Sequence, residues 1–257
     1  MLTYKKSLYI FSVIMIGLII FDYFYPVTRW AYVLLLLLFS FILFYGSYFI
    51  NSGFYIPVTC NGDRQKKQVA LTFDDGPVED KTSAILDTLR KNNVHAAFFC
   101  IGNRMKNLPS VVQRMEQEGH LVGNHSFTHH FFFDLFTRNK MKQELDATNE
   151  TATTIISRKP RLFRPPYGVT TPVLARAISE CTMFPVGWSL RSMDTVTKSE
   201  NKLIHKIEMN IKPGDIVLLH DTESVTVSSL QKIIDLIRSK GLEPVRLDQL
   251  LKTNAYA

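Results

Sequence analysis

The fold is decided by residues 68–77, which read QVALTFDDGP. The run VALTF (69–73) is short and apolar, as in a buried strand, and the Asp-Asp-Gly-Pro sequence behind it is typical of a turn. Further short apolar runs follow at residues 96–101, 120–123, 161–163, 183–188, 215–219 and 243–247. Between them lie amphipathic helical patterns at residues 81–91, 109–118, 140–157, 171–180, 199–211 and 228–240. This alternation predicts an α/β domain with a parallel sheet, which the strands can leave open or close into a barrel.

Composition describes a globular chain with an apolar appendage. It has 257 residues, of which 46% are hydrophobic and 21% charged, so disorder is excluded. This length accommodates one domain of about 200 residues together with an additional segment. Three scattered cysteines are too few for a disulfide framework or a cysteine zinc site. The net charge is +7, but lysine and arginine are spread along the chain, and we expect no nucleic-acid partner.

Two apolar stretches at the start of the chain predict a membrane hairpin. Residues 8–25 and 30–50 each approach the roughly 20 apolar residues that cross a bilayer core. A signal peptide is the alternative for the first stretch, but no small-residue cleavage site follows and the second stretch begins at once. A pair of buried core helices is the other alternative. We expect two transmembrane helices within residues 1–50, a linker at 51–67 and a folded domain at 68–257.

The positions of the cations favour a cytoplasmic domain. Lys5 and Lys6 precede the hairpin, basic residues at 64, 66 and 67 follow it, and Arg29 lies in the connection. Positive charge is enriched in cytoplasmic loops, so both ends of the hairpin score as cytoplasmic, by a small margin.

Residue types used in catalysis fall where the predicted strands end. These strand ends lead to Asp74, Asp75, His125, His129, Arg164, Asp194 and His220. Two adjacent carboxylates repel each other unless a cation separates them. Two histidines four residues apart share a face on a helical turn and, with a carboxylate from another strand, can hold one metal ion. The alternatives are a turn that caps the next helix for the aspartates and a solvated turn for the histidines.

In order along the chain, these residues form motifs that resemble those of the polysaccharide deacetylases with a NodB-homology domain, carbohydrate esterase family 4. The motifs are TFDDGP (72–77), HSFTH (125–129), RPPYG (164–168), Asp194 and LLH (218–220). The resemblance covers roughly residues 68–251. It implies a distorted (β/α) barrel, often with seven strands, that hydrolyses the N-acetyl group of amino sugars.

The resemblance also implies a role for each motif residue. Asp75, His125 and His129 would be the metal ligands, and Asp74 the general base. Zn suits two imidazoles and a carboxylate, as do Co, Ni, Mn and Fe. The remaining implied roles are an ion pair of Arg164 with Asp74, a general acid at His220 tuned by Asp194, an oxyanion donor at Tyr167, and substrate contacts at Leu218, Pro166 and Tyr167.

The fourth motif departs from the family pattern. Asp-x-x-Asp-Trp is common there, whereas this chain has Arg191 and Thr195 on either side of SMD. We expect a different groove wall near Thr195, for which Trp188 is either a replacement surface or a buried strand residue. Four phenylalanines at 131, 132, 133 and 136 are explained by core packing or by a sugar or lipid groove.

The leading hypothesis is a bacterial cell-membrane, metal-dependent carbohydrate N-deacetylase. Its partners would be membrane lipid and an N-acetylated glycan or a lipid-linked amino sugar. The alternatives are an amidohydrolase that acts on a non-sugar C–N bond and a catalytically retired, membrane-anchored glycan-binding protein.

Overall fold

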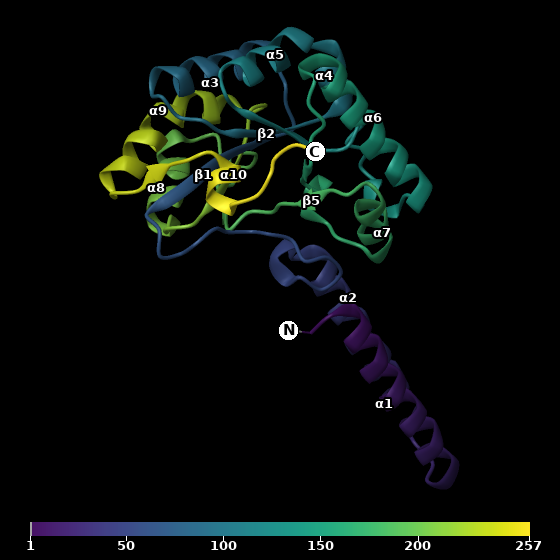
Figure 1. Cartoon of the computed structure of the whole chain (residues 1–257). Coiled ribbons are helices and arrows are strands. Elements are labelled where there is room, and N and C mark those ends of the chain that lie inside the picture. Colours follow the sequence, from purple (N-terminus) through teal and green to yellow (C-terminus); the bar gives the residue numbers. More distant parts are fainter. Residues whose placement is uncertain (1) are drawn as a thin grey trace.

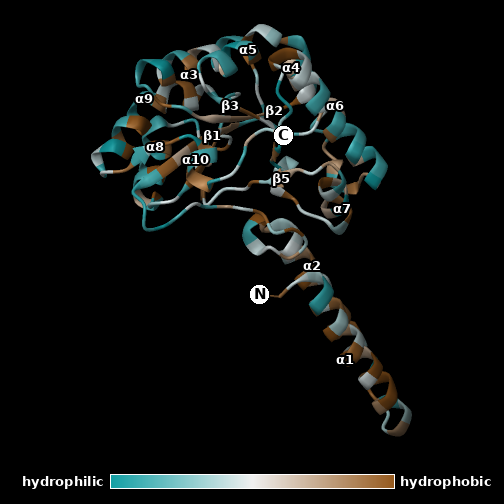
Figure 2. Ribbon diagram, viewed as in Figure 1, coloured by the Kyte–Doolittle hydropathy of each residue, from teal (hydrophilic) through white to brown (hydrophobic). Residues whose placement is uncertain are grey.

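The computed structural model of this protein describes residues 2–257 and consists of a protruding helical hairpin and a half-barrel domain (Figure 1). Helices α1 (Tyr4–Phe24) and α2 (Arg29–Tyr48) form the hairpin. At its turn, Asp22 accepts hydrogen bonds from the Val27 N–H (2.6 Å) and the Tyr32 hydroxyl (2.9 Å). Figure 2 shows hydrophobic residues all along the hairpin, and both helices are long and apolar enough to cross a membrane.

The domain is built on a curled parallel sheet. Its strands are β1 (Gln68–Asp74), β2 (Ala97–Cys100), β3 (Leu121–Asn124), β4 (Leu162–Phe163), β5 (Phe184–Pro185), β6 (Leu190–Arg191), β7 (Ile216–His220) and β8 (Glu243–Pro244). They lie in the order β5-β4-β3-β2-β1-β7-β6, with β8 beside β1. The predicted barrel is thereby confirmed as a half-barrel. Of the strand expected at residues 183–188, only Phe184 and Pro185 form a strand, β5, and the short β6 that follows it in sequence lies at the opposite end of the sheet order.

Helices cover the outside of this sheet (Figure 1). They are α3 (Glu79–Lys91), α4 (Gly102–Asn107), α5 (Pro109–Gln117), α6 (Arg138–Ile156), α7 (Pro172–Glu180), α8 (Glu200–Asn210) and α9 (Ser224–Ser239). The short α10 (Leu247–Leu251) instead packs against the inner face, where its Leu247 and Leu250 are buried with Ala70. Three short 3-10 helices complete the structure: η1 (Ile50–Ser52), η2 (Phe133–Leu135) and η3 (Pro166–Gly168). The predicted helical patterns match α3 and α5 to α9.

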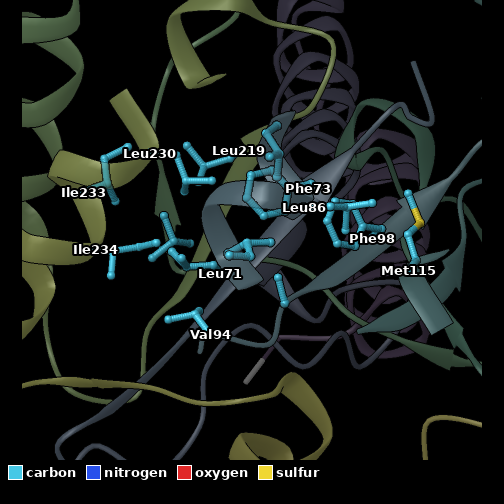
Figure 3. Close-up of a cluster of buried hydrophobic side chains, with 14 of the residues drawn as sticks. Leu71, Phe73, Leu86, Val94, Phe98, Met115, Leu219, Leu230, Ile233 and Ile234 are labelled. Atoms are coloured by element: carbon cyan, nitrogen blue, oxygen red, sulfur yellow. The ribbon is translucent and has the colours of Figure 1, made fainter. Parts of the chain in front are cut away.

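The core lies between the sheet and its helices. Figure 3 shows Leu71 and Phe73 of β1 beside Leu219 of β7 and Ile234 of α9. Alternate residues of β1 point inside the half-barrel, where Ala70 is also buried. Burying one such leucine or phenylalanine contributes about 1.5–3 kcal/mol. A central strand buried on both faces therefore fixes the position of its carboxyl end.

Residues 51–67, expected as a linker, extend the packed domain towards the hairpin. Thr59 pairs with Val186 directly after β5, and Asn61 pairs with Asp215 directly before β7. Ile56 and Cys60 are buried, at 4% and 8% exposure. This segment thus runs along the side of the half-barrel where the sheet does not close.

Candidate active site

Strand register brings the predicted site residues to one edge of the sheet. Asp74 at the end of β1 pairs with His220 at the end of β7. On the other side, Asn124 at the end of β3 pairs with Phe163 of β4, so the residues that follow these two strands emerge together. Parallel strands present their carboxyl ends at one rim, where the sites of β/α barrels form.

The strand ends bring Asp75, His125 and His129 together as a group that can hold a metal ion. The Nε2 atoms of His125 and His129 each lie 3.4 Å from Asp75 Oδ1, and one ligand atom of each residue falls within 4.8 Å of the others. His125 Nδ1 lies 2.8 Å from the Arg164 carbonyl, to which its N–H donates. That bond leaves the Nε2 lone pair directed at the group, as in histidine metal ligands.

The loop that carries the two histidines is not the helical turn we expected. Ser126 and His129 have positive φ angles of 62° and 48°. The Ser126 N–H donates to Asn124 Oδ1 (2.9 Å), the His129 N–H donates to Ser126 Oγ (3.1 Å), and Glu144 Oε2 accepts from the Thr128 N–H (2.7 Å). The rings of His125 and His129 converge because hydrogen bonds to side chains hold Ser126 and His129 in the left-handed conformation. Helical periodicity plays no part.

Charge in the group suits a divalent cation. Burial opposes ionisation of Asp75, but the hydrogen bond and positive charge of His125, with the charge of His220, lower its pKa. Burial and the neighbouring His125 lower the pKa of His129 to about 4, so this imidazole is neutral at pH 7. One carboxylate and imidazole nitrogens are the donors that Zn and its neighbours prefer. The residues present therefore fit a metal ion.

Asp74 is held by a fully buried arginine. Arg164 Nη1 donates to Asp74 Oδ1 (2.7 Å) and to Thr72 Oγ1 (2.9 Å), and its Nη2 donates to the Gly187 carbonyl (2.8 Å). The other oxygen, Asp74 Oδ2, lies 3.9 Å from His125 Nε2 and faces the metal-ligand group. Neither Asp74 nor Asp75 caps α3, whose N-cap residue is Val78, so the capping alternative is wrong.

His220 is paired with a buried carboxylate. Its Nδ1 lies 2.8 Å from Asp194 Oδ1, and Asp194 Oδ2 accepts from the His220 N–H (2.6 Å) and the Thr226 hydroxyl (2.7 Å). Burial opposes charging of this imidazole, but the bond to Asp194 and the charges of Asp194, Asp74 and Asp75 raise its pKa to about 9. The predicted pairing of His220 with Asp194 is therefore present.

These residues line one cavity of about 250 Å³. Leu218 and Tyr167 are among its walls, and the Tyr167 ring lies 4.7 Å from that of His129. Pro166, expected to contact substrate, is buried and does not line the cavity, although its neighbours Pro165 and Gly168 do. The remaining wall is formed by Trp188, Arg191 and Thr195. The expected difference at the fourth motif thus lies in the pocket itself, with Trp188 as part of the wall.

Sequence reasoning gave no role to Asp221, the residue after His220. Its side chain is fully buried and accepts from the Thr82 hydroxyl (2.6 Å), while its Oδ1 has no hydrogen-bond partner within residues 2–257. Burial raises its pKa to about 7. It packs against Gly76, where an added Cβ would lie 1.9 Å from Asp221 Oδ2. The only signal in the sequence that could have pointed to Asp221 was its position directly after His220.

Comparison with known proteins gives the family. The family model for polysaccharide deacetylase matches residues 61–186. A peptidoglycan-N-acetylglucosamine deacetylase of Bacillus cereus is 31% identical over 198 residues, which is 76% of this chain and 72% of that protein.

Solved structures agree in fold. A crystal structure of a peptidoglycan N-acetylglucosamine deacetylase has a TM-score of 0.75 at 29% identity and covers 78% of this chain and 95% of its own. A family pseudoenzyme from Bacillus anthracis has a TM-score of 0.69 at 25% identity, over 74% of this chain and 67% of its own. Sequence match and fold together show that this chain belongs to the polysaccharide deacetylases with a NodB-homology domain, carbohydrate esterase family 4.

Proposed function

We propose that the chain is a membrane-anchored, metal-dependent hydrolase that removes the acetyl group of an N-acetylated amino sugar in a glycan or on a lipid carrier. The observation that carries the proposal is the meeting of three units around one cavity. The metal-ligand group lines it, together with Asp74, which is paired with Arg164, and His220, which is paired with Asp194. The two relatives named above as peptidoglycan N-acetylglucosamine deacetylases support the reaction class.

In this proposal Asp75, His125 and His129 hold one divalent ion, with Zn first among Zn, Co, Ni, Mn and Fe. Such an ion lowers the pKa of a water in its shell and polarises a carbonyl oxygen, which makes an acetamide attackable at neutral pH.

Asp74 accepts the proton of the attacking water. Its Oδ1 is engaged by Arg164, so Oδ2 is the oxygen available for that proton. The water oxygen forms a bond to the acetyl carbon, and the C–N bond then breaks. His220, protonated at neutral pH because of Asp194, donates its proton to the departing amine nitrogen. Acetate and a free amino sugar result.

Two wall residues complete the pocket. The Tyr167 backbone N–H is proposed as a donor to the oxyanion that develops on the acetyl carbonyl. Leu218 is the proposed apolar wall for the acetyl methyl group, and the cavity of about 250 Å³ supports a small acyl group.

The apolar hairpin is proposed as a membrane anchor that leaves both chain ends on one side. The charge margin for a cytoplasmic domain is smaller than the sequence suggests, because Arg64 belongs to the folded domain, where it is paired with Asp215. Fusions of alkaline phosphatase and of green fluorescent protein to the C-terminus test this side. Phosphatase activity in intact cells would overturn the cytoplasmic assignment.

Acetate release from oligomeric N-acetylglucosamine tests the reaction. The full chain in detergent should release acetate, lose this activity with a chelator and regain it when the metal is restored. Release from non-sugar acetamides alone would make it a different amidohydrolase. Binding of the oligomer without release from any substrate would make it a pseudoenzyme.

A further inference from the structure

The hairpin is fastened to the rim of the domain that carries the pocket. The Thr170 N–H donates to the Ser47 carbonyl (3.1 Å), the Ser47 hydroxyl donates to the Thr170 carbonyl (2.7 Å), and the Thr170 hydroxyl donates to the Gly46 carbonyl (3.3 Å). Ser47 lies in the last turn of α2. Thr170 follows Tyr167 by three residues, in the loop after β4. The end of the second apolar helix is therefore joined to a loop that lines the pocket.

Residues 54 and 55 strengthen this contact between α2 and the loop after β4, which we call the junction. The Tyr55 hydroxyl donates to the Leu43 carbonyl (3.3 Å), more than one helical turn before the end of α2, and the Tyr55 ring lies 5.3 Å from that of Tyr4 in the first turn of α1. Phe54 packs so closely on Gly46 that an added Cβ would come within 2.1 Å of its ring. The domain consequently meets both apolar helices directly, without a flexible tether.

A loop beside the pocket is continuous with the junction. Phe133 is buried in one cluster with Ile56, and Tyr55 packs against that cluster. The exposed apolar side chains of this loop, which we call the phenylalanine loop (131–135), are Phe131, Phe132 and Leu135, at 71%, 53% and 73% exposure. The Phe131 ring lies 6.1 Å from that of Tyr167. The phenylalanine loop thus adjoins both the mouth of the pocket and the segment that grips the hairpin.

The phenylalanine loop lies close to the end of the hairpin. Tyr167 is three residues from Thr170, hence at most about 11 Å away along the chain, and Thr170 is bonded to α2. Aromatic side chains near the ends of membrane helices gather at the interface between lipid and water. A bilayer around the hairpin would cover apolar surface that is otherwise left in water.

We propose that the phenylalanine loop rests on the membrane surface and that the pocket acts on an N-acetylated amino sugar carried by a membrane lipid. The junction holds the pocket at a fixed, short distance from the bilayer, so the sugar must be presented there. A lipid carrier presents it at that height. This inference rests on the proposed function, because it takes acetamide hydrolysis as the reaction and names the carrier of the substrate.

Fluorescence tests the surface without activity. Phe132→Trp and the control Met209→Trp are each made in the full chain, in nanodiscs of phosphatidylethanolamine and phosphatidylglycerol with or without brominated acyl chains. Met209 is 68% exposed on α8, on the opposite flank of the domain from α7 (Figure 1). Brominated lipid should quench at least half of the emission added at position 132 and little of that added at 209. Equal quenching at the two positions would overturn the membrane contact.

Kinetics test the substrate. Phe132→Ser/Leu135→Ser and the control Met209→Ser are assayed on an N-acetylglucosaminyl phosphoprenol in the nanodisc and on soluble chitotetraose. The double variant should lower kcat/KM for the lipid-borne sugar at least tenfold, through KM, and change that for the soluble sugar less than twofold. Equal changes on both substrates, or a loss on the soluble one alone, would overturn the lipid-borne substrate. If no variant and no wild type releases acetate, the proposed function fails, and the quenching result still decides the surface.

Discussion

Replacing Asp194 by Asn should move the alkaline limit of activity to lower pH. The carboxylate contacts His220 through Nδ1 (2.8 Å) and through the backbone N–H (2.6 Å). Burial opposes charging of the imidazole, but the hydrogen bond to this ionised carboxylate, followed by its charge, raises the His220 pKa to about 9. Asn keeps the shape and an acceptor for Nδ1 but removes the charge. The His220 pKa should therefore return from about 9 towards the ordinary 6.5, which corresponds to roughly 3 kcal/mol of lost preference for the imidazolium.

The size of the effect follows from the protonated fraction of His220. A general acid works only while protonated, so activity is present below its pKa and is lost as pH rises through it. With a pKa of about 9, kcat/KM falls only about 10% between pH 7 and pH 8, whereas with a pKa near 6.5 it falls about eightfold over the same interval. A divalent ion in the site would offset part of the charge of Asp74 and Asp75. It would therefore lower the alkaline limit of the wild type and that of Asp194→Asn together, and the difference between these two limits would remain.

The assay is acetate release by the metal-loaded full chain at subsaturating substrate from pH 6 to pH 10. Thr226→Val is the matched control, because it removes a hydroxyl bonded to Asp194 Oδ2 (2.7 Å) without changing charge, and its limit should stay near that of wild type. NMR of the histidine ring carbons gives the His220 pKa independently. An Asp194→Asn enzyme that keeps an alkaline limit at wild-type pH would refute the assignment of His220 as an acid tuned by Asp194.

Further predictions concern the other units of the site. Asp74→Asn should lower kcat about 10²–10⁴-fold with metal content unchanged by elemental analysis; loss of the metal together with activity would contradict its role as a base. His129→Ala should lower bound metal per chain well below wild type, whereas the neighbouring control His130→Ala should retain it; equal retention would remove His129 from the ligand set. Gly76→Ala should destabilise the protein by roughly 1–3 kcal/mol in thermal unfolding, because the new Cβ meets Asp221 Oδ2 at 1.9 Å. Adding Asp221→Ala should recover part of that loss, and an unchanged Tm for Gly76→Ala alone would contradict the packing.

Much of the fold could be predicted because the core imposes regular periods on the chain. The pattern at residues 109–118 became α5 (Pro109–Gln117), and the run at 69–73 became β1 (Gln68–Asp74). Residues 51–67 carry no period, because they pair with the sheet only at single bridges such as Thr59 with Val186. Sequence pattern therefore described the segment as a connection and missed that it packs into the domain.

The members of the site were predictable from motif order, and their geometry was not. The motifs identified Asp75, His125 and His129, but helical spacing gave a wrong reason for their convergence, since the loop depends on positive φ angles at Ser126 and His129. The burial of Asp221 behind Gly76 depends on contact between segments far apart in sequence. No local pattern reports such contacts.

The pairing of Thr59 with Val186 determines where the domain can be cut from its anchor. Gly187 donates its N–H to the Thr59 carbonyl (2.9 Å), and its own carbonyl accepts from the Arg164 guanidinium (2.8 Å). A fragment begun at Gln68 would retain every recognisable motif yet lose the backbone that fixes this carbonyl, and with it part of the support for the arginine beside Asp74. A water-soluble version should therefore start before Phe54, so that the segment containing Thr59 remains part of the domain that it stabilises.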